Sequence, residues 1–223
     1  MIRTVQTQVK NILKVYDKSS LEDINEGKHW YFTANKVAQH FADKYNLTLY
    51  QSAGILSALS PGTFWIQNVI DADNFLKNNN AVVSTYKLNK VKAKEILNLT
   101  DKDQIYNVLR GKYNKLMNKT SCFYMNIIEP ENSDFVTIDR HMIRIANNTL
   151  NTFPLTEKRY KDSVKAMQIA GKRLKINPIS LQAITWITFR RVMELSQDMT
   201  ARVMSIDSEI RELFPENKNE LPF

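Results

Sequence analysis

Residues that interrupt helices are scarce in this chain. Its 223 residues include five glycines and six prolines. Several stretches also repeat apolar side chains every three or four residues, namely 2–16, 29–45, 48–60 and 179–195. Because glycine and proline are the main helix breakers and this spacing is typical of amphipathic helices, the sequence predicts an all-α fold of about ten helices.

Local signals place the ends of the expected helices. Five polar residues can cap a helix that follows them: Thr48, Thr63, Asp101, Asn118 and Thr156. Gly27 is expected to break the helical region before residue 29, and Pro61-Gly62 and Gly111 to end two further helices. The remaining helices are expected over 63–77, 88–98, 101–110, 119–128, about 138–150, 157–174 and 199–214.

The cysteine count and the lack of long apolar runs narrow the class of protein. The single cysteine, Cys122, excludes an internal disulfide and a four-cysteine iron–sulfur or zinc site, and it suits a reducing compartment. No apolar run approaches the roughly 20 residues of a membrane span, and the N-terminus lacks the apolar core of a secretory signal. These features favour a cytoplasmic protein with no membrane partner. We further expect a monomer with no metal and no other cofactor.

Positive charge is concentrated in one part of the sequence. The formal net charge is +8, and the stretch from Lys87 to Lys119 carries nine basic residues against three acidic ones. Such an excess fits either a solvated, lysine-rich surface or a face that binds a polyanion.

A carboxylate and an amine, 20 positions apart, are each expected at the start of a helix. Asp139 falls in the first turn of the helix that follows residues 135–138, where N–H groups and the helix dipole lower a carboxyl pKa. Lys119 falls at the start of the helix capped by Asn118, where the same dipole lowers an amine pKa and improves the nucleophile. An ordinary capping acid and an ordinary surface lysine would also fit these positions.

Two segments resemble the core of the helix-hairpin-helix (HhH-GPD) DNA glycosylases of the endonuclease III type. They are Asn118-Lys119-Thr120 and Val136-Thr137-Ile138-Asp139-Arg140-His141-Met142-Ile143-Arg144-Ile145. The resemblance extends over roughly residues 50–195. It implies a two-lobed helical bundle and a DNA glycosylase, with or without lyase activity, that excises a damaged or modified base from double-stranded DNA. The iron–sulfur loop of many members is absent here, as the single cysteine requires.

The resemblance assigns the chemical roles residue by residue. The catalytic aspartate of the family falls on Asp139, and the lysine that forms a Schiff base in its bifunctional members falls on Lys119. The His and Arg of its motif fall on His141 and Arg144 as supporting residues.

Further residues are expected to contact DNA or the flipped base. Ser57-Ala58-Leu59-Ser60 resembles the turn whose third residue, here Leu59, wedges into the duplex. The other expected DNA contacts are Lys112, Lys115, Thr120 and Arg190. Trp30 and Trp65 are expected to line the base pocket, although core packing would also account for them.

The expected organisation is one globular unit over 1–223, with a cleft between two lobes and a tail over 215–223. One lobe is expected over about 30–110, and the other over about 1–29 plus 111–214. Short segments such as His29-Trp30 and Leu181-Gln182-Ala183-Ile184-Thr185-Trp186 resemble phage-encoded members of the superfamily, which implies the host cytoplasm as location.

One departure from the family pattern leaves alternatives open. The family has glycines just before the lysine, which let backbone N–H groups approach a phosphate, whereas this chain has Lys115-Leu116-Met117. A non-catalytic DNA-binding or partner-binding protein is therefore a second hypothesis. A third is an enzyme that acts on hypermodified phage DNA bases, because one fold supports several chemistries.

Overall fold

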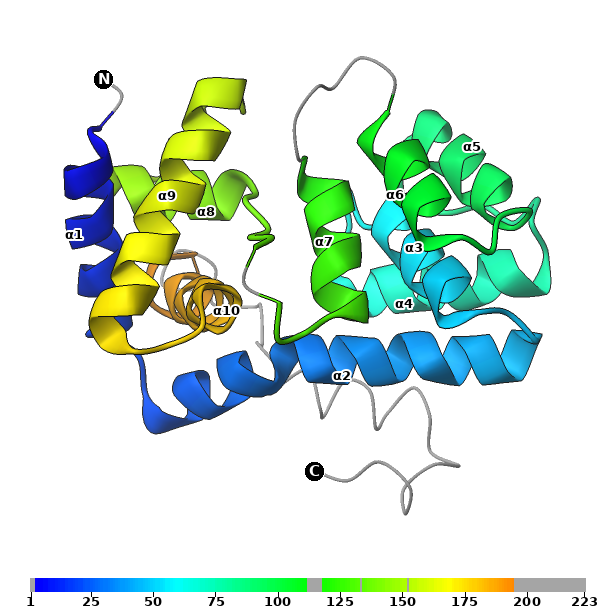
Figure 1. Cartoon of the computed structure of the whole chain (residues 1–223), viewed down its shortest axis with the longest axis horizontal. Helices are drawn as coiled ribbons and strands as arrows, with labels where there is room; N and C mark the ends of the chain where they lie inside the picture. The colour runs from blue at the N-terminus through cyan, green and yellow to red at the C-terminus, as the bar shows by residue number, and fades with distance from the viewer. Residues whose placement is uncertain (1–2, 112–117, 133, 152, 195–223) are drawn as a thin grey trace. The chain divides into compact units, whose positions relative to one another are not determined.

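The computed structural model describes residues 3–111, 118–132, 134–151 and 153–194, and every regular element in those ranges is a helix. The all-α prediction is therefore confirmed. The α-helices are α1 (Val5–Tyr16), α2 (Leu21–Tyr45), α3 (Leu49–Leu59), α4 (Trp65–Lys77), α5 (Lys87–Ile96), α6 (Lys102–Arg110), α7 (Lys119–Ile128), α8 (Arg140–Asn147), α9 (Glu157–Leu174) and α10 (Pro178–Phe189) (Figure 1). A π-helical turn, Arg190–Glu194, continues α10. Within the described ranges no helix has the length and apolar character needed to cross a membrane.

The chain divides into two compact units, and the division differs from the expected one. One unit is Ala34–Thr137, and the other combines Met1–Thr33 with Ile138–Phe223. Residues 111–137 were expected to join the terminal segments, but they belong with 34–110. The reason is that α7 packs against α3 and α6. The predicted helix 199–214 and tail 215–223 lie outside the described residues.

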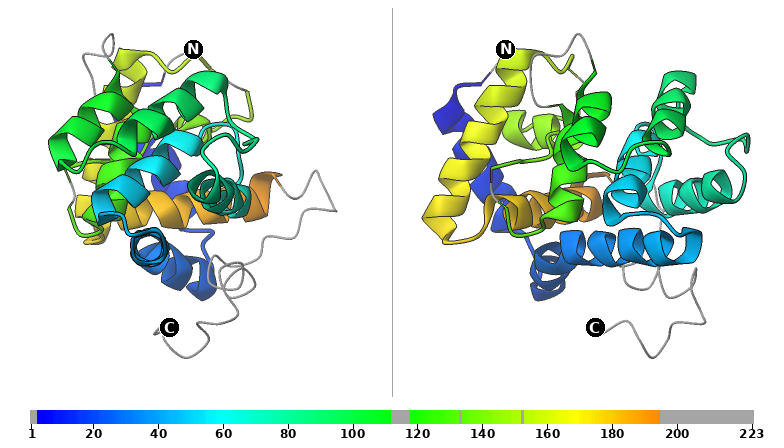
Figure 2. Two further views of the ribbon diagram at one scale, coloured as in Figure 1. Left: turned by 90° about the vertical axis from the view of Figure 1, so that its right-hand side faces the viewer. Right: turned by 45° about the vertical axis from the view of Figure 1, so that its right-hand side comes forward.

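In the unit Ala34–Thr137, α3 is the central helix. It packs against α4, α5, α6 and α7 (Figures 1 and 2), and every residue from Gln51 to Leu59 is buried. A helix that is apolar on all sides needs neighbours on all sides, which explains why four helices surround this one. Thr48 caps it as expected, with a reciprocal capping box to Gln51.

In the other unit, α10 has the equivalent place. It packs against α1, α8 and α9, and the only α10 residues that keep substantial exposure are Pro178, Ser180 and Trp186. Pro178 occupies the first turn, as expected, and Asn177 caps it through a hydrogen bond from the N–H of Ile179.

The predicted break at Gly27 is wrong, because α2 continues through this residue from Leu21 to Tyr45. The glycine serves a close contact instead. A Cβ atom at position 27 would lie 2.4 Å from Cγ1 and 2.5 Å from the backbone nitrogen of Ile184 in α10. Only a residue without a side chain lets the two helices approach this closely.

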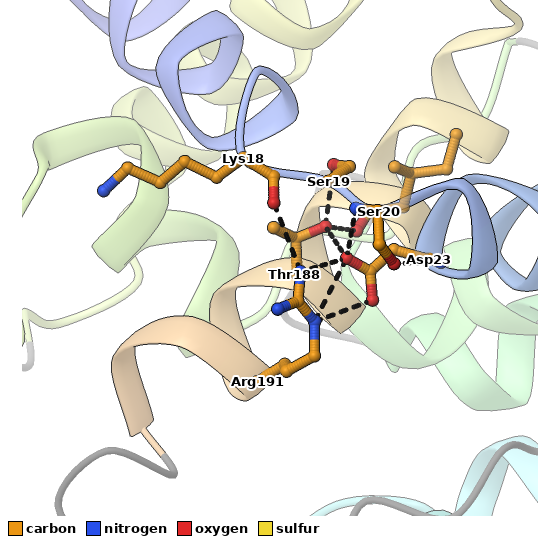
Figure 3. Close-up of polar contacts among 7 residues, drawn as sticks. Lys18, Ser19, Ser20, Asp23, Thr188 and Arg191 are labelled. Carbon is orange, nitrogen blue, oxygen red and sulfur yellow. Dashed lines mark hydrogen bonds and ion pairs between the residues drawn. The ribbon is translucent and has the colours of Figure 1, made fainter.

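An ion pair between the buried Asp23 and the exposed Arg191 connects the π-helical turn after α10 to the start of α2 (Figure 3). The Asp23 carboxylate accepts hydrogen bonds from Nε of Arg191 at 3.0 and 3.2 Å and from Nη2. It also accepts the N–H of Ser20 at 2.8 Å and the hydroxyl of Thr188 at 3.4 Å. Burial raises the pKa of Asp23, but the bonds from Arg191 and Ser20 outweigh it, so the pKa lies below its ordinary value.

Candidate functional site

Asp139 is the N-cap of α8, one position before the expected first turn. Its Oδ1 accepts the N–H groups of His141 and Met142, both at 2.9 Å. Within the described parts of the chain, its Oδ2 accepts no hydrogen bond. The side chain is half-buried. One carboxylate oxygen therefore holds the helix, and the other remains available at the helix N-terminus, where the dipole favours negative charge.

The segment that leads into Asp139 is held from two directions. Asn126, completely buried in α7, donates through Nδ2 to the carbonyl of Phe135 at 2.7 Å and accepts the hydroxyl of Thr137 at 2.7 Å. One residue later, the N–H of Ile138 donates to the hydroxyl of Tyr160 in α9 at 3.4 Å. These bonds fix the backbone immediately before the candidate catalytic acid.

Aromatic rings lie beside the first turn of α8. The His141 ring meets Trp186 edge to face at 6.3 Å, and Trp186 meets Trp30 in the same way at 6.4 Å. The guanidinium of Arg190 lies 4.9 Å from the centroid of Trp186. His141, Trp186 and Arg190 are half-buried, whereas Trp30 is only 9% exposed. We call Trp30, His141, Trp186 and Arg190 the tryptophan cluster; it combines flat apolar faces with a cation.

Sequence reasoning did not identify Trp186 or Gln182 as site residues, although a signal was present. Gln182, Trp186 and Arg190 are spaced four residues apart, so they share one face of α10 and its continuation. The amide oxygen of Gln182 accepts the hydroxyl of Tyr31 at 2.7 Å, and the Tyr31 ring meets Trp30 at 4.9 Å. The cluster is thus supported from behind by a buried hydrogen bond between α2 and α10.

Lys119 is the first residue of α7, as predicted, and Asn118 caps that helix with a capping box. The end of α6 fixes this helix start in space. Asn118 Nδ2 donates to the carbonyl of Arg110 at 2.9 Å. The hydroxyl of Thr120 donates to the carbonyl of Leu109 at 3.2 Å. The lysine backbone is therefore held on both sides, while its side chain is half-buried.

A second lysine takes part in the same junction. Nζ of Lys92 donates to the carbonyl of Leu109 at 2.9 Å, and burial lowers the pKa of Lys92. A cation at the last carbonyls of a helix is favourable. Lys92 is therefore a structural residue that secures the end of α6.

The structure assigns other roles to several predicted DNA contacts. Leu59 is completely buried, so the prediction that it wedges into a duplex is wrong: its side chain belongs to the core around α3. Thr120 binds the end of α6 through its hydroxyl. Trp65 is half-buried and packs edge to face on Phe123 at 6.1 Å. Lys112 and Lys115 lie outside the described residues, as does the glycine-free segment 115–117.

The predicted site residues fall into two groups. Asp139, His141, Arg144, Trp30 and Arg190 belong to the unit formed by the terminal segments. Lys119, Thr120, Leu59 and Trp65 belong to the unit Ala34–Thr137. Arg144 is half-buried on α8, five residues after Asp139. In the described part of the chain, no group of three or more His, Cys, Asp or Glu side chains is arranged to hold a metal ion.

Among the comparisons with known proteins, only the comparison with sequence-family models gives a match. No curated protein and no solved structure matches the chain. Residues 2–193 match the model described as a family of unknown function (DUF7178). Because this match covers most of the chain, from α1 into the π-helical turn after α10, the protein belongs to that family.

Proposed function

We propose that the protein is a DNA glycosylase that releases a damaged or modified base, with Asp139 as the catalytic carboxylate. Breaking the bond between base and sugar leaves positive charge on the sugar, at C1′ and the ring oxygen. A fixed carboxylate stabilises this charge electrostatically. The geometry of Asp139 supports the role, because the Oδ1 bonds fix the side chain and Oδ2 is left for the sugar.

The tryptophan cluster supports a nucleotide as the ligand beside Asp139. Flipped bases are bound by stacking on aromatic side chains, and His141 and Trp186 are half-buried rings next to the α8 start. Arg190, which lies over Trp186, supplies a cation of the kind that binds phosphate. Carboxylate, flat rings and cation match the sugar, base and phosphate of one nucleotide.

Lys119 has the role of nucleophile in this proposal. Its amine attacks C1′ and forms a C–N bond while the bond from C1′ to the base breaks. The base leaves with the bonding electrons and takes up a proton. Loss of an amine proton and opening of the sugar ring then give a Schiff base, which permits strand cleavage by elimination.

The decisive experiment compares two aspartates with the same structural job. Asp101 caps α6 as Asp139 caps α8, since its Oδ1 accepts the N–H groups of Asp103 and Gln104 at 3.0 and 2.9 Å. Asparagine also caps helices well, so Asp139→Asn and Asp101→Asn should both fold. Base release from duplexes carrying a panel of modified bases, followed by mass spectrometry, should disappear in Asp139→Asn alone. Equal base release by Asp139→Asn and Asp101→Asn would show that Asp139 is not the catalytic residue.

The lysine is tested separately by trapping. Borohydride should link the wild-type protein covalently to substrate DNA, and Lys119→Gln should abolish this link. Lys161→Gln is the control, because Lys161 forms an exposed ion pair with Glu157 on α9. Trapping that persists in Lys119→Gln would exclude Lys119 as the nucleophile. Base release without any covalent trapping would indicate a monofunctional glycosylase, which has no lyase activity.

The residues before Lys119 favour a second candidate function. Lys115-Leu116-Met117 lacks the glycines with which related hairpins approach a phosphate, so a DNA-binding protein without catalysis is the alternative. It predicts salt-dependent DNA binding that is equal in wild type and Asp139→Asn, with no product from any base in the panel. An enzyme that remodels bases would instead change the mass of the base without producing an abasic site.

A further inference from the structure

Exposed apolar side chains gather in one short region of the unit Ala34–Thr137. Nine large hydrophobic residues are exposed in the described part of the chain, and five of them lie between positions 64 and 91. They are Phe64, Val82, Tyr86, Leu88 and Val91, with exposed fractions of 53 to 93%. Scattered exposed hydrophobics are ordinary, but a concentration of this kind marks an interaction surface.

Several contacts hold the backbone of the two turns that precede α4 and α5. The hydroxyl of Thr85 donates to the carbonyl of Pro61 at 2.9 Å, so the turn before α4 touches the turn before α5. A Cβ atom on Gly62 would lie 3.6 Å from the Tyr86 ring. The buried Asp71 accepts the N–H of Ser84 at 2.7 Å. The exposed side chains therefore project from a backbone that is already fixed.

Helix α5 continues this surface beyond the two turns. Leu88 and Val91 are three residues apart and share one exposed face of α5. We call Phe64, Tyr86, Leu88 and Val91 the exposed apolar face.

Lysines outnumber acidic residues around the exposed apolar face, although Glu95 is exposed on α5 and Asp73 pairs with Lys77. From Asn74 to Lys94 the sequence contains five lysines and no acidic residue. Lys87 is exposed at the start of α5, and Lys94 lies one turn further along, where it donates to Asn80 at 2.7 Å. A partner that fits this face is negatively charged and presents flat apolar surfaces.

We propose that the exposed apolar face binds an unpaired nucleic-acid strand. Bases of a single strand expose their faces to aromatic side chains such as Phe64 and Tyr86, whereas bases in a duplex are stacked on each other. The phosphates of the strand match the exposed Lys87 at the start of α5. The inference deepens the proposed function and rests on it for the choice of DNA among polyanions, but it requires no chemistry at Asp139.

The test measures binding of the full chain to a labelled oligothymidylate by fluorescence anisotropy. Stacking of one base on an aromatic ring accounts for roughly a tenfold difference in affinity or more. Phe64→Ala and Tyr86→Ala should therefore each weaken binding about tenfold, and Tyr86→Phe, which keeps the ring, should bind like wild type. Leu155→Ala is the matched control, because Leu155 is exposed in the other unit. Circular dichroism checks that each variant folds.

Three results would overturn this inference. The first is oligothymidylate binding that is unchanged in Phe64→Ala and Tyr86→Ala. The second is no binding of the single strand by wild type. The third is equal or stronger binding of phosphatidylglycerol vesicles that is lost in the same variants, which would indicate a membrane surface. Weaker strand binding in Phe64→Ala and Tyr86→Ala supports the surface whether or not these variants still release a base. Loss of base release in Asp139→Asn with strand binding intact bears only on the catalytic proposal.

Discussion

Replacing Arg191 by alanine tests whether the ion pair at the end of α10 stabilises the fold. The change removes every bond from the guanidinium to Asp23, together with its bond to the carbonyl of Lys18 at 3.2 Å. The Asp23 side chain is 5% exposed, whereas that of Arg191 is 42% exposed. The substitution therefore leaves a buried carboxylate and removes a partner that is already half in water.

The size of the effect follows from this asymmetry. Removing one partner of a fully buried pair costs about 3–5 kcal/mol, while most surface pairs contribute about 0–1 kcal/mol. Asp23 keeps the bonds from Ser20 and Thr188, and water can enter the space left by the arginine. We therefore expect Arg191→Ala to lower the free energy of unfolding by about 2–3 kcal/mol, equivalent to roughly 4–12 °C in Tm.

Urea unfolding followed by circular dichroism measures the change, with Lys158→Ala as the control. Lys158 pairs with Asp162 at 2.6 Å, but its side chain is 75% exposed, so the expected loss is below about 0.5 kcal/mol. In an Asp23→Asn background the buried charge is gone, and Arg191→Ala should then cost about 1 kcal/mol or less. A double-mutant coupling below about 0.5 kcal/mol would refute the reasoning.

The same pair predicts a dependence on pH. Because the folded pKa of Asp23 is lowered from 3.8, its contribution is complete above the unfolded pKa and is lost as the pH falls through the folded pKa. The stability difference between wild type and Arg191→Ala should therefore be constant from pH 5 to 7 and shrink below about pH 4. A difference that grows on acidification would contradict the assignment.

Three further predictions concern other parts of the fold. Gly27→Ala should destabilise by about 1–3 kcal/mol in urea unfolding despite the better helix propensity of alanine, because its Cβ would lie 2.4–2.6 Å from Ile184; a stabilised variant would show that the helices can separate. Asn126→Ala should cost about 2–3 kcal/mol, because it leaves the Phe135 carbonyl unpaired, whereas an unchanged urea midpoint would mean that water replaces the amide. Burial raises the pKa of Asp73, but hydrogen bonds from Lys44, Lys77 and Tyr45 lower it to about 2. The wild type should therefore lose stability between about pH 4 and 2, and Asp73→Asn should lose less over that range. Parallel curves of unfolding free energy against pH for the two proteins would contradict this.

Helix ends were predictable where their cause is local. Thr48, Asp101, Asn118 and Thr156 each cap the helix that follows them, because a capping side chain needs only the N–H groups two or three residues ahead. The start of α4 was misplaced by one residue, because Phe64 and not Thr63 is the N-cap, and no side-chain hydrogen bond caps this helix.

Features whose cause lies far away in the chain were not predictable. The role of Gly27 depends on Ile184, and the ion pair of Asp23 depends on Arg191, 168 residues away. Leu59 was misjudged because a short motif indicates where a turn lies but not which of its side chains the surrounding helices cover. The tryptophan cluster needed the folded arrangement of α2, α8 and α10, although the four-residue spacing from Gln182 to Arg190 was visible in the sequence.

The hydrogen bond from Asn126 to the Phe135 carbonyl fixes the loop before Asp139 through the main chain and not through a loop side chain. The amide recognises a main-chain oxygen, which every residue type has, and Phe135 itself is only half-buried. The hydrogen bond that holds the backbone before Asp139 therefore requires the amide at position 126 but no particular side chain at position 135, where the ring serves a separate contact with Tyr106. In any other chain with this loop, an amide at the equivalent of position 126 would be the better guide to a correctly placed aspartate than similarity in the loop itself.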